Sequence, residues 1–143
     1  MSVNYNLEIE FLKKVENSRD ESNKREIVTE EQIKILVEKH PKIPEDYIVY
    51  LKEIGGGNFR ECFFKVHPFL FDLEDIGLDE HYDLKENVWF FGDNFAGDFS
   101  GFDFDKNDGH VVEFWHETGD LNYTDTTFQE YIREQMSFIK TGT

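Results

Sequence analysis

The densest run of metal-binding residue types is Asp103-Phe104-Asp105-Lys106-Asn107-Asp108-Gly109, followed closely by Glu113. Alternating side-chain oxygens of this kind can wrap a hard cation such as Ca²⁺. The glycine comes one position later, and Glu113 one position earlier, than a calcium loop requires, and the flanking residues have the pattern of strands instead of helices. An acidic turn between two strands therefore explains the run better than a calcium site.

Histidines offer a second kind of metal chemistry. Four of them could act as zinc ligands: His67, His81, His110 and His116. None has a recognised ligand spacing, and His116-Glu117 lacks the second histidine that a zinc protease motif places one helical turn later. We therefore expect no bound metal or other cofactor.

Nucleophilic catalysis has little support in the sequence. Cys62 lies in a predicted apolar strand, where burial disfavours the reactive thiolate. The chain has no G-x-S-x-G elbow and no Gly-Lys-Ser/Thr phosphate loop, and Gly55-Gly56-Gly57 follows a predicted helix instead of preceding one. We predict a protein without catalytic residues. A metal-dependent hydrolase is the least favoured hypothesis.

Charge points to binding instead of catalysis. The 143 residues include 31 acidic and 15 basic side chains, a net charge of −16. Residues 72–143 alone hold 18 acidic against 4 basic residues, a balance of −14. A surface of this sign disfavours DNA, RNA and anionic membranes, since each requires local positive charge. It suits either solubility or a basic protein partner such as a nuclease, whose cationic cleft an acidic module can fill.

Acidic residues on the predicted loops of the second half are the candidate partner contacts. They are Glu74, Asp75, Asp79, Glu80, Asp93, Asp98 and Asp108.

Three helices are predicted in the first half of the chain. The first spans 5–18, with apolar residues at helical intervals, and a polar linker covers 17–26. Thr29-Glu30-Glu31-Gln32 has the pattern of a capping box and begins the second helix, which ends at His40-Pro41. Pro44 begins the third, which Gly55-Gly56-Gly57 ends. The expected buried residues are Leu7, Phe11, Leu12, Val15, Ile33, Leu36, Val37, Tyr47, Ile48, Leu51 and Ile54.

Strands follow from Phe59 onwards. One runs from 59 to 66 and is interrupted by Pro68; 72–85 is irregular, with a short helix at 73–77. Further strands are predicted at 88–91, at 98–104 with a bulge at Gly101, and at 111–116 after a turn at 106–109. A helix at 127–139 closes the chain, with Phe128, Tyr131, Ile132 and Met136 inward.

This order predicts one α+β domain over residues 1–143. The lone Cys62 allows no intrachain disulfide, and Met1–Glu10 lacks the pattern of a secretory signal peptide. We therefore expect a cytoplasmic protein. The oligomeric state is left open.

Several of these segments together resemble the SUKH superfamily, the Smi/Knr-like proteins. The helical signature is Thr29–Ile33 with Ile43–Tyr47 and Leu51–Gly57, and the second hallmark is the glycine-and-acid turn Phe91–Phe99. Val111–His116 and Phe128–Ile132 fall where the family places its last strand and helix. The resemblance covers about 28–138.

The resemblance implies a curved, mostly antiparallel sheet packed by N-terminal and C-terminal helices. It also implies a non-enzymatic role, because many bacterial members are immunity proteins that bind polymorphic toxins, often nucleases. We therefore expect an immunity protein that occludes the basic surface of a toxin. The alternative is a regulatory scaffold of the cell-wall-assembly type that binds an endogenous protein.

Overall fold

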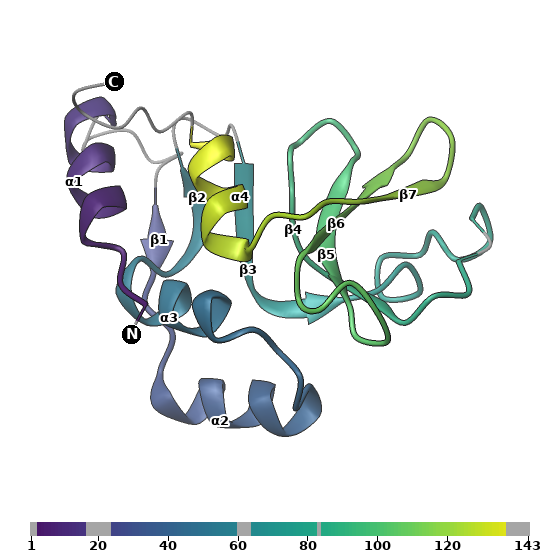
Figure 1. Ribbon diagram of the computed structural model, residues 1–143, viewed down its shortest axis with the longest axis horizontal. Helices are drawn as coiled ribbons and strands as arrows, with labels where there is room; N and C mark the ends of the chain where they lie inside the picture. Colours follow the sequence, from purple (N-terminus) through teal and green to yellow (C-terminus); the bar gives the residue numbers. More distant parts are fainter. Residues whose placement is uncertain (1–2, 17–23, 60–63, 83, 137–143) are drawn as a thin grey trace.

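The computed structural model describes residues 3–16, 24–59, 64–82 and 84–136. Its helices are α1 (Asn6–Val15), α2 (Glu30–Lys39), α3 (Glu45–Glu53) and α4 (Phe128–Gln135). Its strands are β1 (Arg25–Glu26), β2 (Gly56–Phe59), β3 (Phe64–Phe71), β4 (Val88–Asp93), β5 (Phe99–Asp103), β6 (Val111–Trp115) and β7 (Asp120–Tyr123). The fold is α+β, as predicted (Figure 1).

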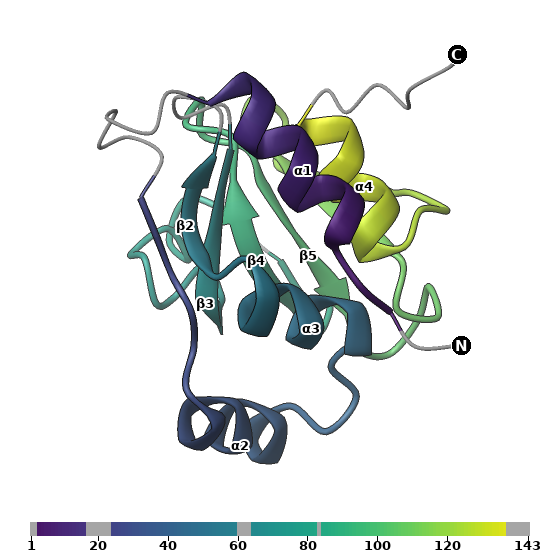
Figure 2. The ribbon, with the colours of Figure 1, turned by 90° about the vertical axis from the view of Figure 1, so that its left-hand side faces the viewer.

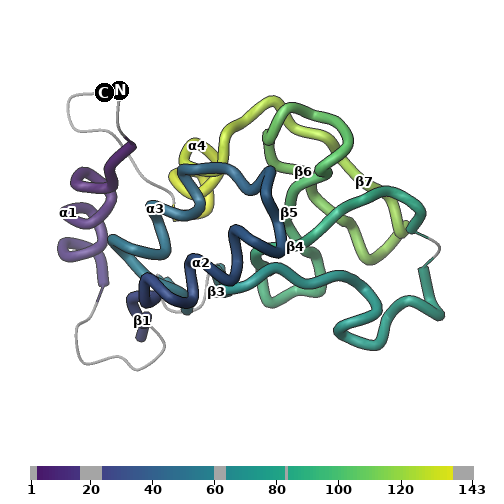
Figure 3. Tube along the Cα trace, turned by 90° about the horizontal axis from the view of Figure 1, so that it is seen from below, coloured from purple at the N-terminus to yellow at the C-terminus, as the bar shows by residue number. Residues whose placement is uncertain are grey.

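The seven strands form one open sheet in which spatial order follows chain order, and every neighbouring pair is antiparallel. Helices α1, α3 and α4 cover one face (Figure 2). The connection between β3 and β4, residues 72–87, covers the other face over β4, β5 and β6 (Figure 3). Only one face of the sheet is therefore packed by helices, and the second is closed by a loop.

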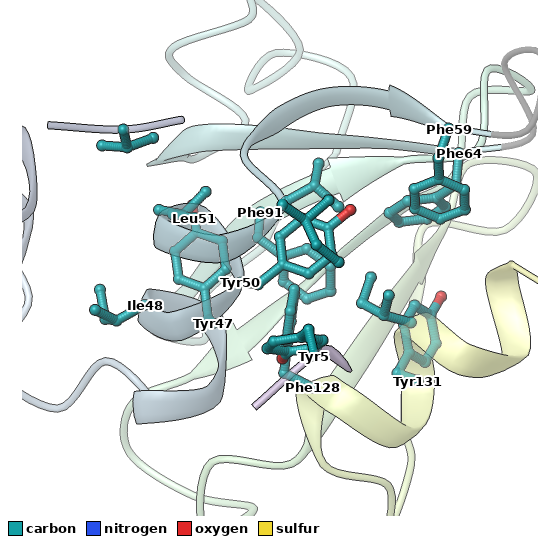
Figure 4. Packing of buried hydrophobic residues seen from close by; sticks show 14 of the residues in the cluster. Tyr5, Tyr47, Ile48, Tyr50, Leu51, Phe59, Phe64, Phe91, Phe128 and Tyr131 are labelled. Carbon is teal, nitrogen blue, oxygen red and sulfur yellow. The ribbon is translucent and has the colours of Figure 1, made fainter. Parts of the chain in front are cut away.

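Two consecutive phenylalanines of β4 point to opposite faces of the sheet. Phe91 is fully buried on the helix side, with its ring 4.8 Å from Phe128 and 5.1 Å from Phe102 (Figure 4). Phe90 is fully buried on the loop side, 5.8 Å from Phe71 and 5.9 Å from Phe114. Each ring is thus the centre of one hydrophobic layer.

A β-bulge accompanies Phe91. In the β4–β5 register Phe90 pairs with Gly101 and Gly92 with Ser100, so Phe91 is the extra residue. The sequence places this bulge at Gly101, and the structure puts the inserted residue on the facing strand. Gly101 is required nonetheless, because a Cβ there would lie 2.2 Å from the Trp89 carbonyl oxygen.

Capping interactions begin two of the helices. Thr29 and Gln32 form the predicted capping box at α2. Thr127 and Glu130 form a second one at α4, which sequence analysis did not identify. These side chains satisfy amide groups that the first helical turn leaves without partners.

Asp46 joins three helices. Its carboxylate accepts hydrogen bonds from the Gln129 amide at the start of α4 and from the Tyr47 amide, and its carbonyl accepts one from the Tyr5 hydroxyl at 2.6 Å. Burial raises the pKa of this carboxyl, although the two amide donors oppose the change. Asp46 therefore fixes α4 and the N-terminal segment relative to α3.

The first helix is correct in position but not in its buried face. Leu7 is 54% exposed, whereas Glu8 is fully buried. The Glu8 carboxylate accepts a hydrogen bond from the Gln129 side chain at 2.7 Å and lies 3.3 Å from the Arg133 guanidinium. Apolar spacing did not identify this face because a paired charge occupies part of it. In α2, likewise, Val37 is exposed and His40 is buried.

Other boundaries also differ from the prediction. Arg25–Glu26 of the predicted linker form β1, which pairs with β2, while 17–23 lie outside the described residues. The predicted strand at 59–66 is wrong: Phe59 ends β2 and Phe64 begins β3 in a hairpin, and 60–63, with Cys62, lie outside the described residues. Pro68 does not interrupt β3, which continues to Phe71.

The remaining differences concern the second half. Residues 73–77 form turns instead of a helix, and β7 was not predicted. The last helix is described as far as Gln135, with all four predicted inward residues buried. No helix in the described part of the chain combines the length and apolar character needed to cross a membrane.

We expect Phe91→Ala to lower the free energy of unfolding by about 3–5 kcal/mol, because it leaves a cavity among several aromatic rings. Phe69→Ala is the matched control, since Phe69 is 53% exposed, and it should change stability by less than about 0.5 kcal/mol. Chemical denaturation measures both values. A loss below about 1 kcal/mol for Phe91→Ala would contradict its central role.

Candidate functional site

Three adjacent hollows form a groove at the end of the sheet where β4 begins and β5 ends. The first, of about 290 Å³, shares Asn87 and Trp89 with the second, of about 340 Å³. The second shares Lys42 and Phe104 with the third, of about 530 Å³. We call them the acidic, aromatic and turn hollows, and together the end groove.

The acidic hollow carries four carboxylate side chains, and no Lys, Arg or His is among the described residues that line it. The carboxylates are Asp72, Glu74, Asp79 and Glu86. They come from the beginning, the middle and the end of the β3–β4 connection, which returns to the sheet at β4. Like charges that line one hollow produce a negative potential that attracts a cationic group.

The β3–β4 connection is held in place by its own apolar residues. Leu73 is buried, and the Tyr82 ring lies 4.9 Å from Phe114 in an edge-on contact. The Tyr82 hydroxyl donates to the His116 carbonyl at 2.9 Å. The first turn is closed by reciprocal amide-to-carboxylate bonds between Asp72 and Asp75. The acidic side chains therefore project from a segment that is docked on the sheet.

The aromatic hollow is built around a buried imidazole. His40 is 6% exposed and its ring lies 4.8 Å from Trp89 and 5.6 Å from Phe104. Burial lowers the pKa of His40, and the neighbouring Lys39 ammonium lowers it further. Lys39 also lies over the Trp89 ring, with Nζ 5.4 Å from its centroid. Among the described residues, this hollow is lined by two lysines, Lys39 and Lys42, and by no carboxylate, and it shares lining residues with the acidic hollow and with the turn hollow.

The turn hollow is lined by most of the segment 103–109, which was compared with a calcium loop in the sequence. Asp103 is buried, and its carboxylate accepts hydrogen bonds from the Tyr123 hydroxyl at 2.7 Å and the Asp105 amide at 2.9 Å. The following turn has positive φ at Asn107, Asp108 and Gly109, as expected of an acidic hairpin turn. Nowhere in the described residues do three or more His, Cys, Asp or Glu side chains gather as a metal ion would need.

Asp93 ends β4 and Asp98 lies in the turn before β5, at the opposite end of these strands. Asp93 Oδ2 is 3.0 Å from His67 Nε2, and Asp98 Oδ1 is 2.7 Å from His116 Nδ1. Burial alone would raise the pKa of both carboxyls, but hydrogen bonds from the histidines and from backbone amides outweigh it and hold both pKa values below the usual range. Both carboxylates brace the turn.

The structure therefore divides the predicted contact residues. Glu74 and Asp79 both line the acidic hollow, and Asp108 lines the turn hollow. Glu80 is exposed on the same connection without lining a described hollow. Asp75 caps its own turn, and Asp93 with Asp98 is remote from the groove.

Three residues that line the acidic hollow are not among the predicted contact residues. Asp72 and Glu86 lie at the two ends of the acidic connection between β3 and β4. Their positions next to predicted strands could have indicated that the fold brings them together. Trp89 gave no such signal, because it lies in an apolar strand whose neighbours are core residues. Among the proposed zinc ligands, His67 and His116 pair with different aspartates. His110 lines the turn hollow, and His81 is exposed.

The family model of the SMI1 / KNR4 family (SUKH-1) matches residues 27–134, from just before α2 almost to the end of α4. The chain belongs to the SMI1/KNR4 family. The SMI1/KNR4 match includes every residue of the end groove and the whole β4–β5 turn. Helix α1 lies before the match, yet Tyr5 and Leu12 are buried in the same core. No curated protein and no solved structure matches the chain.

The Asp98–His116 pair gives a pH-dependent prediction. Because the folded pKa of Asp98 is below its ordinary value of 3.8, its contribution to stability is complete at neutral pH and is lost as the pH falls through the folded pKa. We expect Asp98→Asn to be less stable than the wild type at pH 7, by a difference that shrinks as the pH falls through the folded pKa of Asp98.

Thermal unfolding of both proteins across this range provides the measurement. Glu117→Gln serves as a control, since Glu117 is exposed on the neighbouring turn. A stability difference that stays constant from neutral to acid pH would show that the Asp98 charge does not stabilise the turn.

Proposed function

We propose that this chain is a cytoplasmic immunity protein that binds a basic bacterial toxin of the nuclease type and neutralises it by covering its cationic surface. Membership of the SMI1/KNR4 family supports an immunity or Smi1-like role at the level of the family. The acidic hollow carries the more specific proposal, because it gathers four carboxylates beside the half-buried Trp89.

The chemistry of the groove fits such a partner. A nuclease cleft carries cations that bind phosphate groups, and carboxylates in a hollow offer those cations an alternative set of acceptors. Trp89 adds an aromatic surface of the kind that is enriched at binding hot spots. The docked β3–β4 connection presents these groups with little ordering left to occur on binding, which favours affinity. Neutralisation then needs occlusion and no chemical step.

Protection of cells is the direct test. The toxin encoded beside the gene for this chain is expressed with and without it, and the purified pair is examined by calorimetry. We expect survival and a complex of one toxin with one chain. Equal killing in both cases would exclude the proposal. Capture from the native cell of a regulatory protein unrelated to toxins would favour the scaffold alternative.

Neutralising the acidic hollow should slow association with the toxin. We expect the isosteric triple variant Glu74→Gln, Asp79→Asn, Glu86→Gln to bind at least about tenfold more slowly, because charged residues at an interface steer the encounter. Stopped-flow or surface-based kinetics gives the rate.

The matched control removes the same number of charges from exposed helical positions, at Glu10, Glu31 and Glu38. It should stay within about threefold of the wild-type rate, because these side chains are outside the end groove. Equal slowing by both triple variants would assign the effect to net charge instead of to the acidic hollow.

Salt should act on the same step. The Debye length falls from about 30 Å at 10 mM salt to about 8 Å at 150 mM, so the wild-type association rate should fall steeply over this range. The triple variant of the hollow should show a shallower dependence, and dissociation should change less than association in both. A wild-type association rate that does not respond to salt would leave the acidic half as a solubilising surface only.

A further inference from the structure

The β4–β5 turn displays a phenylalanine in a strained conformation. Phe95 has φ of 65°, in the left-handed region that bulky L-residues rarely occupy. Its side chain is 51% exposed and belongs to neither of the two buried clusters. Glycine or asparagine would adopt this backbone with less strain. The needs of the fold therefore do not explain a phenylalanine at this position.

The turn is held firmly around that residue. Asp93 Oδ1 accepts from the Phe95 amide at 3.1 Å, and Asn94 Oδ1 accepts from the amides of Ala96 and Asp98. The side-chain amide of Asn94 donates a hydrogen bond through Nδ2 to Asp98 Oδ2 at 3.3 Å. These bonds fix the backbone on both sides of Phe95, so strain at this residue can persist.

Two histidines anchor the turn to its neighbours. His67 of β3 pairs with Asp93, and His116, just after β6, contacts Asp98 through both its amide and its ring. A Cβ at Gly97 would lie 3.2 Å from the His116 ring, so the turn packs closely against that side chain. Phe95 is thus carried by a rigid element that is tied to the strands on either side.

We propose that Phe95 is an anchor residue that inserts into an apolar socket of the protein partner. Such a residue contributes most when its ring is already exposed and its backbone is fixed before binding. Trp115, which is 43% exposed, ends β6 and directly precedes His116, whose amide donates to Asp98 of the turn. Asp93 and Asp98 put two carboxylates on either side of Phe95 in the same turn, which fits a socket with a cationic rim.

This inference rests on the proposed function, because the partner is the same basic toxin. It adds a second contact region at the connection between β4 and β5 (Figure 1). This connection is at the other end of the strands from the residues that line the end groove. The strain is then retained because binding selects the exposed ring, while stability alone would select glycine.

The Phe95→Gly variant distinguishes selection for partner binding from selection for stability. The variant relieves the strained φ and removes the ring, so we expect its thermal midpoint to equal or exceed that of the wild type while its affinity for the toxin falls about 30-fold. Phe95→Tyr keeps the ring and should bind within about threefold of the wild type. Phe69→Ala, which removes a ring of similar exposure from β3, should leave affinity unchanged.

The outcomes are distinct. Wild-type affinity in Phe95→Gly would overturn the anchor role, and so would a marked loss of stability, which would make Phe95 a structural residue. A toxin that the wild type itself does not bind would instead exclude the proposed function. Equal weakening by Phe69→Ala would show that general surface hydrophobicity, and not the turn, governs binding.

Discussion

The packing of Phe90 and Phe91 on opposite faces of one strand is the constraint on which the rest of the molecule depends. Phe91 contacts the helices that cover one face, and Phe90 contacts the aromatic residues beneath the β3–β4 connection on the other. A sheet with two apolar faces must be covered twice, since either face alone would expose large rings to water. Helices cover the first face, and an acidic loop covers the second.

That loop explains how so much negative charge can belong to a stable domain. Leu73 and Tyr82 of the connection are packed against the sheet, while Glu74 and Asp79 remain at its surface. The apolar residues hold the segment, and the carboxylates between them face solvent. The acidic hollow is therefore a product of the same packing that closes the second hydrophobic layer. The packed side chains and the charged side chains of this one segment are therefore different residues.

Local patterns predicted many elements because their causes are local. The capping box at Thr29, the aromatic face of α3 and the hairpin turn before Gly109 depend on residues within a few positions of each other. Errors arose where distant partners decide. Glu8 is buried only because Gln129 and Arg133 of α4 reach it, and Arg25–Glu26 become a strand only beside β2. Neither partner can be recognised from its spacing in the sequence.

The sequence by itself determined the fold class, the family resemblance and the concentration of charge in the second half, because these follow from composition, order and short-range pattern. Only the tertiary structure decided which carboxylates line the same hollow. Asp72 and Glu86 line the same hollow because the chain returns to the sheet at β4. Asp93 and Asp98 instead form hydrogen bonds with His67 and His116. Charge is a property of residues, but a charged surface is a property of their arrangement in space.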